Sequence, residues 1–359
     1  MSARPILIMA GGTGGHVYPA LAVAENLRER SQDVVWLGTQ RGLESRVVPA
    51  AGIDIEWISI KGLRRKGLLA LIIAPLQLAW ALIQSLNVIR RRRPSAVLGM
   101  GGFASGPGGL AAWLTRRPLI IHEQNAVPGL TNRLLARLAR VVLQAFPGSF
   151  NRVSETVGNP VRKTIAKLPS PEQRFDNRSG PIRLLVLGGS QGALALNRTV
   201  PEALALLDES SRPVVRHQCG KRTLDMAQQQ YQRLGVTAEL PEFIEDMAEA
   251  YGWADFVICR AGALTVAELC AAGLGAIFIP YPAAVDDHQT ANARAMQDAG
   301  AALIIDEKEL TAETLAAEMR SWSDRAGLLR RAKLARELAH PDALDRITTV
   351  CLEQAGRTS

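Results

Sequence analysis

Short apolar runs that stop at glycine turns, each followed by a helical pattern, occur in both halves of the chain. Residues 5–10 (P-I-L-I-M-A) end at the turn 11–16, and a helical pattern follows over residues 18–30. Residues 182–187 (I-R-L-L-V-L) end at the turn 188–192, before another helical pattern. Mostly apolar runs bounded by glycine are typical of parallel strands that are buried on both faces. Each half is therefore predicted to open with a strand, a glycine turn and a helix.

Further apolar runs continue this alternation. They cover residues 34–37, 96–99, 119–122 and 141–145 in the first half, and residues 214–218, 256–258, 276–279 and 302–305 in the second. Helical stretches separate most of them, which predicts an α/β protein of two parallel sheets, each with helices on both faces. We expect the domain boundary between Asn159 and Pro181, where proline, serine and asparagine cluster.

The composition indicates which class of protein this is, and the net charge indicates which kind of partner it binds. The 359 residues correspond to about two domains, and 47% hydrophobic with 21% charged residues is ordinary globular usage. A net charge of +8 favours an anionic partner, such as a phosphate or an acidic membrane face. The four cysteines form no C-x-x-C pair, so we expect neither a disulfide framework nor a zinc site. This use of cysteine is typical of a protein in a reducing compartment. The first apolar run predicts a strand rather than a signal peptide.

The two glycine turns indicate phosphate chemistry. Glycines after a strand let backbone N–H groups approach a phosphate, and the next helix adds its positive dipole end. A tight turn without a ligand is the alternative. Neither turn completes G-x-G-x-x-G, since Val17 and Ser190 occupy glycine positions, so a dinucleotide site is disfavoured. Because ligands bind beyond the carboxyl ends of parallel strands, two facing sheets suit a reaction between two substrates.

Polar residues follow two strands of the first half. His16 is expected at the start of a helix, whose positive end favours the neutral imidazole that can accept a proton from a sugar hydroxyl. The run from His122 to Asn125 follows another strand end, where ligands bind. Hydrogen bonding within the loops is the alternative interpretation for His16, and for His122 and Glu123 in particular.

The second half carries two further candidate groups. The stretch Ala263–Glu268 is predicted to begin a helix, which would offer its amides to a pyrophosphate and Glu268 to a ribose; a surface glutamate is the alternative. Gln289 and Asn292 lie three residues apart, on one helical face, and amides suit sugar hydroxyls. The adjacent Asp286 and Asp287 are accompanied by no second carboxylate cluster, so a metal site is disfavoured.

A long apolar segment with basic flanks follows in the first half. Residues 67–89 carry no charge and are flanked by basic residues at 61–66 and 90–93. A transmembrane helix is disfavoured because Pro75 and a polar helical side interrupt the run. Nucleic-acid binding is disfavoured by the lack of aromatic interleaving. We expect a membrane-surface patch on a crossover helix. Its members are Arg64, Arg65, Lys66, Leu68, Leu69, Ile72 and Trp80.

Five motifs in one order give the chain a recognisable signature. They are Gly11–His16, Gly99–Phe103 with Ser105–Pro107, His122–Asn125, Gly188–Gly192 and Gly262–Glu268. Together they resemble the bacterial peptidoglycan N-acetylglucosaminyltransferases that convert lipid I to lipid II, over nearly the whole chain. The resemblance implies the GT-B fold of two Rossmann-like domains facing across a cleft, inversion at the anomeric carbon, and no metal or other cofactor in the site.

The resemblance also implies roles for parts of the chain. Residues 1–160 with 341–359 would form the acceptor and membrane domain, and residues 161–340 the UDP-N-acetylglucosamine domain. His16 would be the catalytic base, and the loop at Gly101 and Gly102 would hold the acceptor. Ser190 would contact a phosphate, Ile244 the uracil, and Glu268 the ribose. The other expected donor contacts are Thr13, Gly14, Gly15, Asn125 and Arg162 from the N-terminal domain, and Ala263, Leu264, Thr265, Val266, Ala267, Gln289 and Asn292.

The expected partners are therefore UDP-N-acetylglucosamine, lipid I and an anionic membrane surface, with other cell-wall synthesis proteins in addition and no nucleic acid. The expected location is peripheral, on the cytoplasmic face of the bacterial inner membrane. Two alternatives stay open: another UDP-sugar enzyme of this fold, such as a UDP-N-acetylglucosamine 2-epimerase, and a non-enzymatic nucleotide-sugar-binding protein of the membrane surface.

Overall fold

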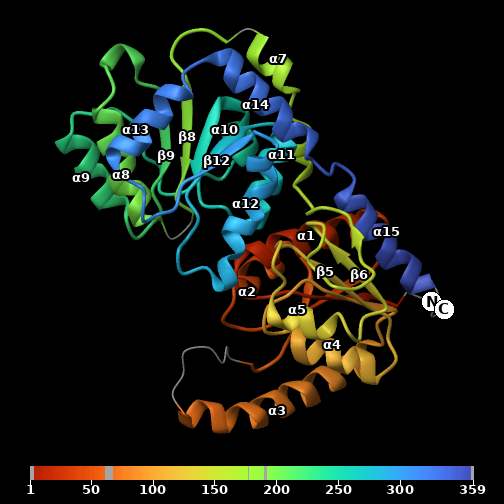
Figure 1. Cartoon of the computed structure of the whole chain (residues 1–359). Coiled ribbons are helices and arrows are strands. Elements are labelled where there is room, and N and C mark those ends of the chain that lie inside the picture. The colour runs from red at the N-terminus through yellow and green to blue at the C-terminus, as the bar shows by residue number, and fades with distance from the viewer. Residues whose placement is uncertain (1–3, 61–67, 177, 190–191, 357–359) are drawn as a thin grey trace. The chain divides into compact units, whose positions relative to one another are not determined.

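The computed structural model of the chain describes residues 4–60, 68–176, 178–189 and 192–356, without the side chains of residues 68–73 and Val285. The chain divides into two compact units (Figure 1). One comprises Met1–Val161 with Asp342–Ser359, and the other comprises Arg162–Pro341.

The first unit is built on a parallel sheet of seven strands in the order β3-β2-β1-β4-β5-β6-β7. The strands are β1 (Ile6–Met9), β2 (Val34–Gly38), β3 (Asp54–Trp57), β4 (Ala96–Gly99), β5 (Leu119–Glu123), β6 (Val141–Gln144) and β7 (Glu155–Thr156). The central strand β1 is fully buried, as expected for a strand with helices on both faces of the sheet.

The strands predicted from the sequence are confirmed in both units, within one residue at either end. Two strands were missed, β3 and β7, and both lie at sheet edges. An edge strand is only partly covered, so its sequence need not form an apolar run. In β3 the residues D-I-E-W are half-buried or exposed, and β7 has only two residues.

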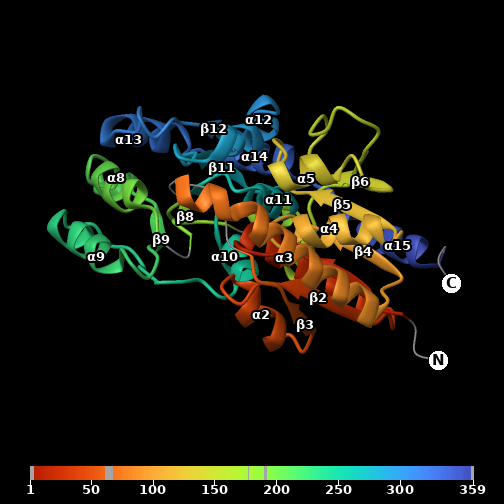
Figure 2. The same ribbon diagram turned by 90° about the horizontal axis from the view of Figure 1, so that it is seen from below.

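Helices connect the strands of the first sheet. They are α1 (Gly14–Glu29), α2 (Glu44–Ala50), α3 (Leu68–Arg92), α4 (Ser105–Leu114) and α5 (Leu130–Leu135). The long helix α3 runs beside α4 (Figure 2). Helix α1 begins at Gly14, four residues before the predicted start. The N–H groups of a first helical turn have no partner within the helix, and glycine is tolerated at these positions. His16 consequently lies inside the first turn.

The last helix, α15 (Ala343–Gly356), belongs to the first unit, where it packs against α1 and β4. Its buried face contributes Ile347, Val350 and Cys351 to the core beneath β1 and α1. Buried Asn26 of α1 donates its amide to Thr348 Oγ1 at 3.0 Å and to Asp345 Oδ1 at 3.0 Å. The tail is therefore held by apolar packing together with a small polar cluster.

The second unit has a parallel sheet of five strands in the order β12-β11-β10-β8-β9. They are β8 (Arg183–Leu187), β9 (Val214–Gln218), β10 (Phe256–Cys259), β11 (Gly275–Phe278) and β12 (Ala302–Ile304). One apolar core, which includes Leu184, Phe256, Ile277 and Trp322, joins the sheet to its helices.

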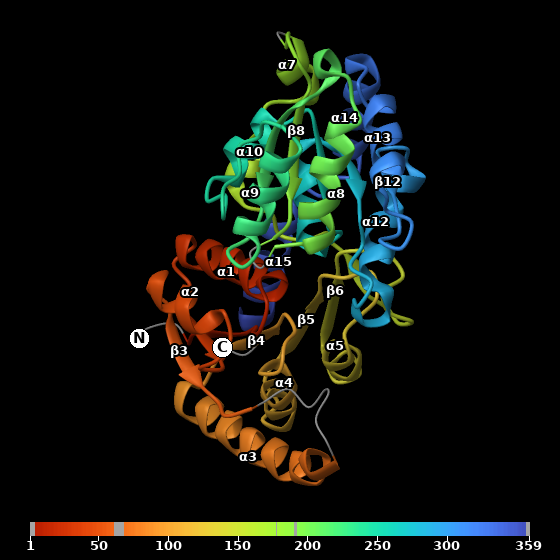
Figure 3. The same ribbon diagram turned by 90° about the vertical axis from the view of Figure 1, so that its left-hand side faces the viewer.

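Nine α-helices and two short 3₁₀ helices are described around this sheet. They are α6 (Lys163–Ala166), α7 (Pro171–Asp176), α8 (Leu194–Ala205), α9 (Leu224–Arg233), α10 (Met247–Trp253), α11 (Ala263–Ala272), α12 (His288–Asp298), α13 (Ala312–Ser321) and α14 (Arg325–Glu337), with η1 (Glu209–Ser211) and η2 (Val285–Asp287). Helices α8 and α9 lie side by side, as Figure 3 shows.

We predict that apolar packing, rather than ion pairing, anchors α15. Ile347→Ala should lower the free energy of unfolding of the first unit by roughly 2–5 kcal/mol, because Ile347 is fully buried. Arg346 of the same helix makes a half-exposed bidentate pair with Glu155, at 2.6 and 2.9 Å. Arg346→Gln should therefore cost less than about 1 kcal/mol. Urea unfolding of both variants tests this, and equal losses would contradict it.

Candidate functional site

Two glycine loops of the first unit touch through their backbones. One follows β1 at Gly11 and Gly12, and the other follows β4 at Gly101 and Gly102. Strands β1 and β4 pair in parallel, so both loops follow carboxyl ends of strands at the same end of the sheet. Gly102 has a φ of +84°, and a Cβ there would overlap the backbone of Gly11. Only glycine permits this approach, which exposes backbone groups where a ligand can reach them.

The imidazole of His16 lies against this pair of loops. A Cβ on Gly101 would lie 3.0 Å from both Cε1 and Nδ1 of His16. Nδ1 is 2.9 Å from Oε1 of Gln124, which directly follows β5. The ends of three adjacent strands, β1, β4 and β5, therefore meet around one half-buried histidine.

Hydrogen bonding determines which nitrogen of His16 carries the proton. Nε2 of Gln124 donates to the carbonyl oxygen of His122 at 3.2 Å and to its Nδ1 at 3.1 Å. A carbonyl only accepts, so the amide nitrogen of Gln124 must face His122 and its oxygen must face His16. His16 therefore carries hydrogen on Nδ1 and has a lone pair on Nε2. That is the tautomer of a general base acting through Nε2.

His122 supports this arrangement as a buried neutral residue. Its Nε2 donates to the carbonyl oxygen of Gly158 at 2.9 Å, so its Nδ1 is the acceptor that Gln124 requires. Burial lowers the pKa of His122 to about 4. The imidazole accordingly stays neutral at physiological pH, and the direction of the hydrogen bonds is preserved.

Glu123 and Asn125 shape the loop that follows β5. The buried Glu123 carboxylate accepts hydrogen bonds from Asn125 N at 2.9 Å, Asn132 Nδ2 at 2.9 Å and Gly129 N at 3.2 Å. It also accepts from the Asn125 side chain at 3.2 Å. Glu123 therefore braces the loop, and it holds the side chain of Asn125 in a half-exposed position.

Glu44 supports the glycine loop beside His16, and sequence reasoning missed it. It begins α2, is fully buried, and accepts hydrogen bonds from Gly12 N at 2.9 Å, Thr39 N at 3.0 Å and Thr39 Oγ1 at 2.7 Å. One carboxylate thus ties the loop after β1 to the loop after β2. No motif signals this role, because Glu44 and Gly12 are 32 residues apart in the chain.

In the second unit, the first glycine loop follows β8. Gly189 and Gly192 have φ values of +76° and +80°. A Cβ on Gly192 would overlap Thr223 Oγ1 and the carbonyl oxygen of Cys219, so Gly192 packs closely on the loop after β9. The predicted phosphate contact Ser190 lies outside the described residues.

The N-terminus of α11 follows the central strand β10. Gly262 is its N-cap and has no side chain that could cap the helix. Asn292 of α12 is fully buried and donates to the carbonyl oxygen of Ala261 at 3.2 Å, which fixes the loop before the helix. The helix start predicted at Ala263 is confirmed. It places the backbone of residues 263–265, including Leu264, in the first turn, where N–H groups and the dipole favour an anion.

Glu268 lies farther along α11, where its buried carboxylate contacts buried Tyr251 and half-exposed Arg162. Its Oε1 pairs with Nη2 of Arg162 at 3.0 Å, and its Oε2 accepts from the hydroxyl of Tyr251 at 3.0 Å. Burial raises the pKa of Glu268, and the Arg162 guanidinium acts against that rise. Burial also raises the pKa of Tyr251 well above its usual value, so the phenol stays protonated as a donor.

This cluster corrects one expectation and adds one residue. Arg162 was expected to act together with the N-terminal donor contacts, although the expected boundary at residue 161 already gave it to the second domain. It begins the second unit and pairs with Glu268 inside it. Tyr251 was missed, because a lone tyrosine in a helical pattern gives no sign of a hydrogen bond to a residue 17 positions away.

The remaining candidates of the second unit lie in loops around this helix. Gln289 Oε1 accepts from the backbone N of Tyr281 at 2.9 Å, which shapes the turn before α12. Ile244 lies half-buried in the loop before α10. Asp287 accepts from Thr290 Oγ1 at 2.7 Å. Within the described ranges, no three His, Cys, Asp or Glu side chains gather in a way that could hold a metal ion.

Helix α3 has an exposed apolar face, which includes Trp80 of the expected membrane patch. Its side chains Leu76, Trp80 and Ile83 are 72%, 56% and 48% exposed, a large apolar surface for one helix. No helix among the described residues is long and apolar enough to span a bilayer. Of the expected patch, Arg64, Arg65 and Lys66 lie outside the described residues, as do the side chains of Leu68, Leu69 and Ile72.

Comparison with known proteins shows the family, because a family model matches each half of the chain. Residues 6–144 match the glycosyltransferase family 28 N-terminal domain, and residues 183–347 match the glycosyltransferase family 28 C-terminal domain. A relative from Alkalilimnicola ehrlichii, named "UDP-N-acetylglucosamine--N-acetylmuramyl-(pentapeptide) pyrophosphoryl-undecaprenol N-acetylglucosamine transferase", is 60% identical over 98% of this chain and 99% of its own. A relative of the same name from Marinobacter nauticus is 55% identical over 98% of both chains.

Solved structures agree with this result. The crystal structure of MurG from Acinetobacter baumannii has a TM-score of 0.86 and 40% identity, and covers 98% of this chain and 99% of its own. The calicheamicin glycosyltransferase CalG4, at 17% identity and a TM-score of 0.70 over the full length of both chains, shares the fold. The expected GT-B fold is thereby confirmed. The chain belongs to glycosyltransferase family 28 and, within it, to the family of these N-acetylglucosamine transferases.

Proposed function

We propose that the chain transfers N-acetylglucosamine from UDP-N-acetylglucosamine to the C4 hydroxyl of the muramyl-pentapeptide sugar of lipid I, which forms lipid II for peptidoglycan synthesis. The observation that carries the proposal is the 60% identity, over 98% of the chain, to a transferase named for this reaction. A Listeria monocytogenes protein whose structure is described as a "putative UDP-N-acetylglucosamine 2-epimerase" has a TM-score of 0.68 at 14% identity, a likeness of fold alone.

The proposed base is His16. Its Nε2 lone pair takes the proton of the acceptor hydroxyl while the hydroxyl oxygen attacks the anomeric carbon and the bond to the nucleotide's β-phosphate oxygen breaks. Attack opposite the leaving group turns the α-linked donor into a β-linked product. The imidazolium that forms keeps its Nδ1–H bond to Gln124 Oε1, which holds the ring in place during the transfer.

The donor is assigned to the second unit. The first-turn amides of α11 would stabilise the negative charge that grows on the departing diphosphate, and the Arg162 guanidinium would add a positive charge nearby. The Glu268 oxygens each accept one hydrogen bond, from Arg162 and Tyr251. A carboxylate oxygen has lone pairs for a second donor, so Glu268 can still accept from the ribose hydroxyls.

We assign the membrane surface to the segment 61–93, which combines basic residues with the exposed apolar face of α3. Apolar side chains would enter the interface while lysine and arginine meet anionic headgroups. The proposed location is therefore peripheral, on the cytoplasmic face of the bacterial inner membrane, where the lipid-linked acceptor can be reached.

The transfer assay tests the proposed reaction directly. We expect labelled sugar to pass from UDP-N-acetylglucosamine to purified lipid I, and EDTA to leave the rate unchanged because amides and Arg162 stabilise the leaving group. Absence of product would contradict the transferase, and conversion of the nucleotide sugar without an acceptor would favour the epimerase. Loss of activity on chelation would contradict the metal-free mechanism.

Substitution of His16 tests the base. His16→Ala should lower kcat by about 10²–10⁴, because the proton of the attacking hydroxyl loses its acceptor. The KM for the donor should change little. His340→Ala removes an exposed histidine and is the matched control. A variant with the kcat of the wild type would leave His16 with a role in loop structure only.

Charge reversal tests the membrane surface. The triple variant Arg64→Glu, Arg65→Glu, Lys66→Glu should bind anionic liposomes more weakly than the wild type, since attraction to headgroups is lost. Activity on a short-chain soluble acceptor should persist. The control makes the same change in charge at three exposed arginines of the second unit, Arg233, Arg294 and Arg330. Equal liposome binding by the two triple variants would refute the assignment.

A further inference from the structure

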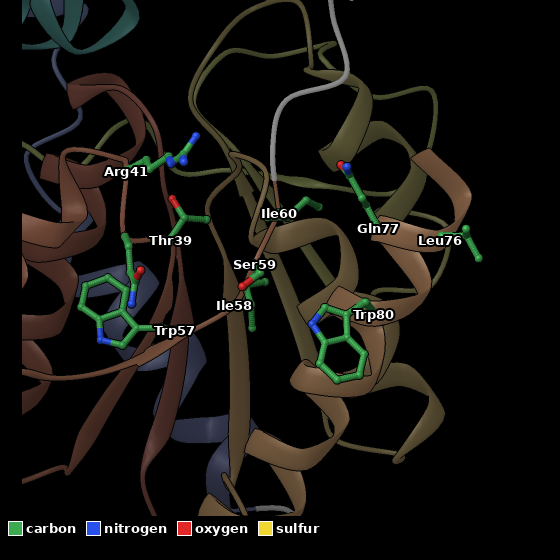
Figure 4. Close-up of a pocket in the computed structure, with 10 residues that line it drawn as sticks. Thr39, Arg41, Trp57, Ile58, Ser59, Ile60, Leu76, Gln77 and Trp80 are labelled. Carbon is green, nitrogen blue, oxygen red and sulfur yellow. The ribbon is translucent and has the colours of Figure 1, made fainter. Parts of the chain in front are cut away.

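A cavity of about 490 Å³ lies in the first unit between β3 and α3, outside the residues that the proposed mechanism uses (Figure 4). Such a volume is in the range of small-molecule sites. Its apolar lining consists of Trp57, Ile58, Ile60, Leu76 and Trp80. Figure 4 shows the two indoles on opposite sides of the hollow, with the chain from Ile58 to Ile60 between them.

The polar lining carries charge of only one sign. Among the described residues that line the cavity, Arg41 is the only charged one, and the others are uncharged. Arg41 is exposed. None of the ion pairs found among the described residues involves Arg41. The cavity therefore fits a ligand with an apolar body and an anionic end, because a guanidinium binds phosphate oxygens in a bidentate way.

The walls of the cavity are held by specific contacts. Ser59 N donates to Oε1 of Gln84 at 2.8 Å, which fixes the chain after β3 against α3. At the far end of α3, Arg92 Nε donates to Glu56 Oε1 at 2.6 Å. Thr39 is held by Glu44, as described above. The cavity is therefore a built feature of this unit and not a gap between unconnected surface loops.

The cavity connects two regions of the first unit to which the proposed function gives different tasks. On one side, Glu44 binds both Thr39 of the cavity wall and Gly12 of the loop that leads to His16. On the other side, Leu76 and Trp80 belong both to the cavity and to the exposed apolar face of α3. A ligand that extends from the histidine loop to the membrane surface would pass between them.

We propose that this cavity binds the prenyl diphosphate portion of the lipid-linked acceptor, with the diphosphate at Arg41 and the first prenyl units against the apolar lining that includes Trp57 and Trp80. This inference rests on the proposed function for the identity of the acceptor. The cavity admits only the units nearest the diphosphate, and the remainder of the chain leaves over α3 toward the bilayer. Trp57 and Arg41 thereby become determinants of acceptor affinity.

A soluble probe tests the cavity independently of catalysis. Binding of farnesyl diphosphate to the full chain is measured by calorimetry with saturating UDP, which occupies the other diphosphate site. Arg41→Gln and Trp57→Ala should each raise the Kd by about tenfold, the effect expected when a central cation or indole is removed from a binding site. Trp57 serves better than Trp80, because Trp80 also belongs to the proposed membrane surface.

Matched controls separate the cavity from general effects. Arg46→Gln removes an exposed arginine of α2, and Trp113→Ala removes a tryptophan of α4 that is 49% exposed; neither residue lines the cavity. Both should keep the Kd of the wild type. Ser59→Trp fills the cavity from an exposed position without deleting a large side chain, and should also weaken binding. Its result keeps the test decisive if Trp57→Ala fails to fold.

The outcomes distinguish the inference from the proposed function. Absence of saturable binding by the wild type, or an unchanged Kd in Arg41→Gln and Ser59→Trp, overturns the inference even if lipid I is glycosylated. Equal affinity for inorganic diphosphate alone, for farnesol alone, or for phosphatidylglycerol micelles also overturns it. Weakened farnesyl diphosphate binding in the cavity variants supports the site, whatever the result of the transfer assay.

Discussion

The first unit depends on the approach of two backbones, at Gly102 and Gly11. A side chain on Gly102 would overlap the backbone of Gly11. The loops after β1 and β4 can therefore lie this close only because residue 102 is glycine. Their contact makes room for His16 against Gly101, and from there the hydrogen bonds run through Gln124 to His122 and Gly158. The orientation of the candidate base thus follows from steric space rather than from a charged partner.

Three buried carboxylates organise the loops, each by a different balance of forces. Glu44 and Glu123 accept mainly backbone and amide N–H groups, which satisfy a charge without a cation and join segments distant in sequence. Glu268 is balanced by a guanidinium and a phenol, and burial still raises its pKa. A half-exposed arginine such as Arg162 is accessible to a ligand, whereas backbone amides are fixed with their loop.

Most of the fold could be predicted from the sequence, but the connections within the site could not. Buried parallel strands are nearly continuous apolar runs, so β1, β8 and β10 were evident, whereas the edge strand β3 alternates and was missed. The glycine turns predicted the positions of the loops, and the sequence identified His16 beside one of them as a candidate base. Tyr251, Glu44 and the tautomer set by Gln124 depend on contacts between distant segments, which no local pattern encodes.

The position of α15 has a consequence for how the polypeptide acquires its structure. The second unit is inserted between Val161 and Asp342 of the first, and α15 supplies part of the first core. During synthesis from the N-terminus, the ribosome releases every residue of the inserted unit before the closing helix of the first emerges. The unit whose translation starts earliest is therefore completed last, and until then the surface of α1 and β4 that α15 covers lacks its partner.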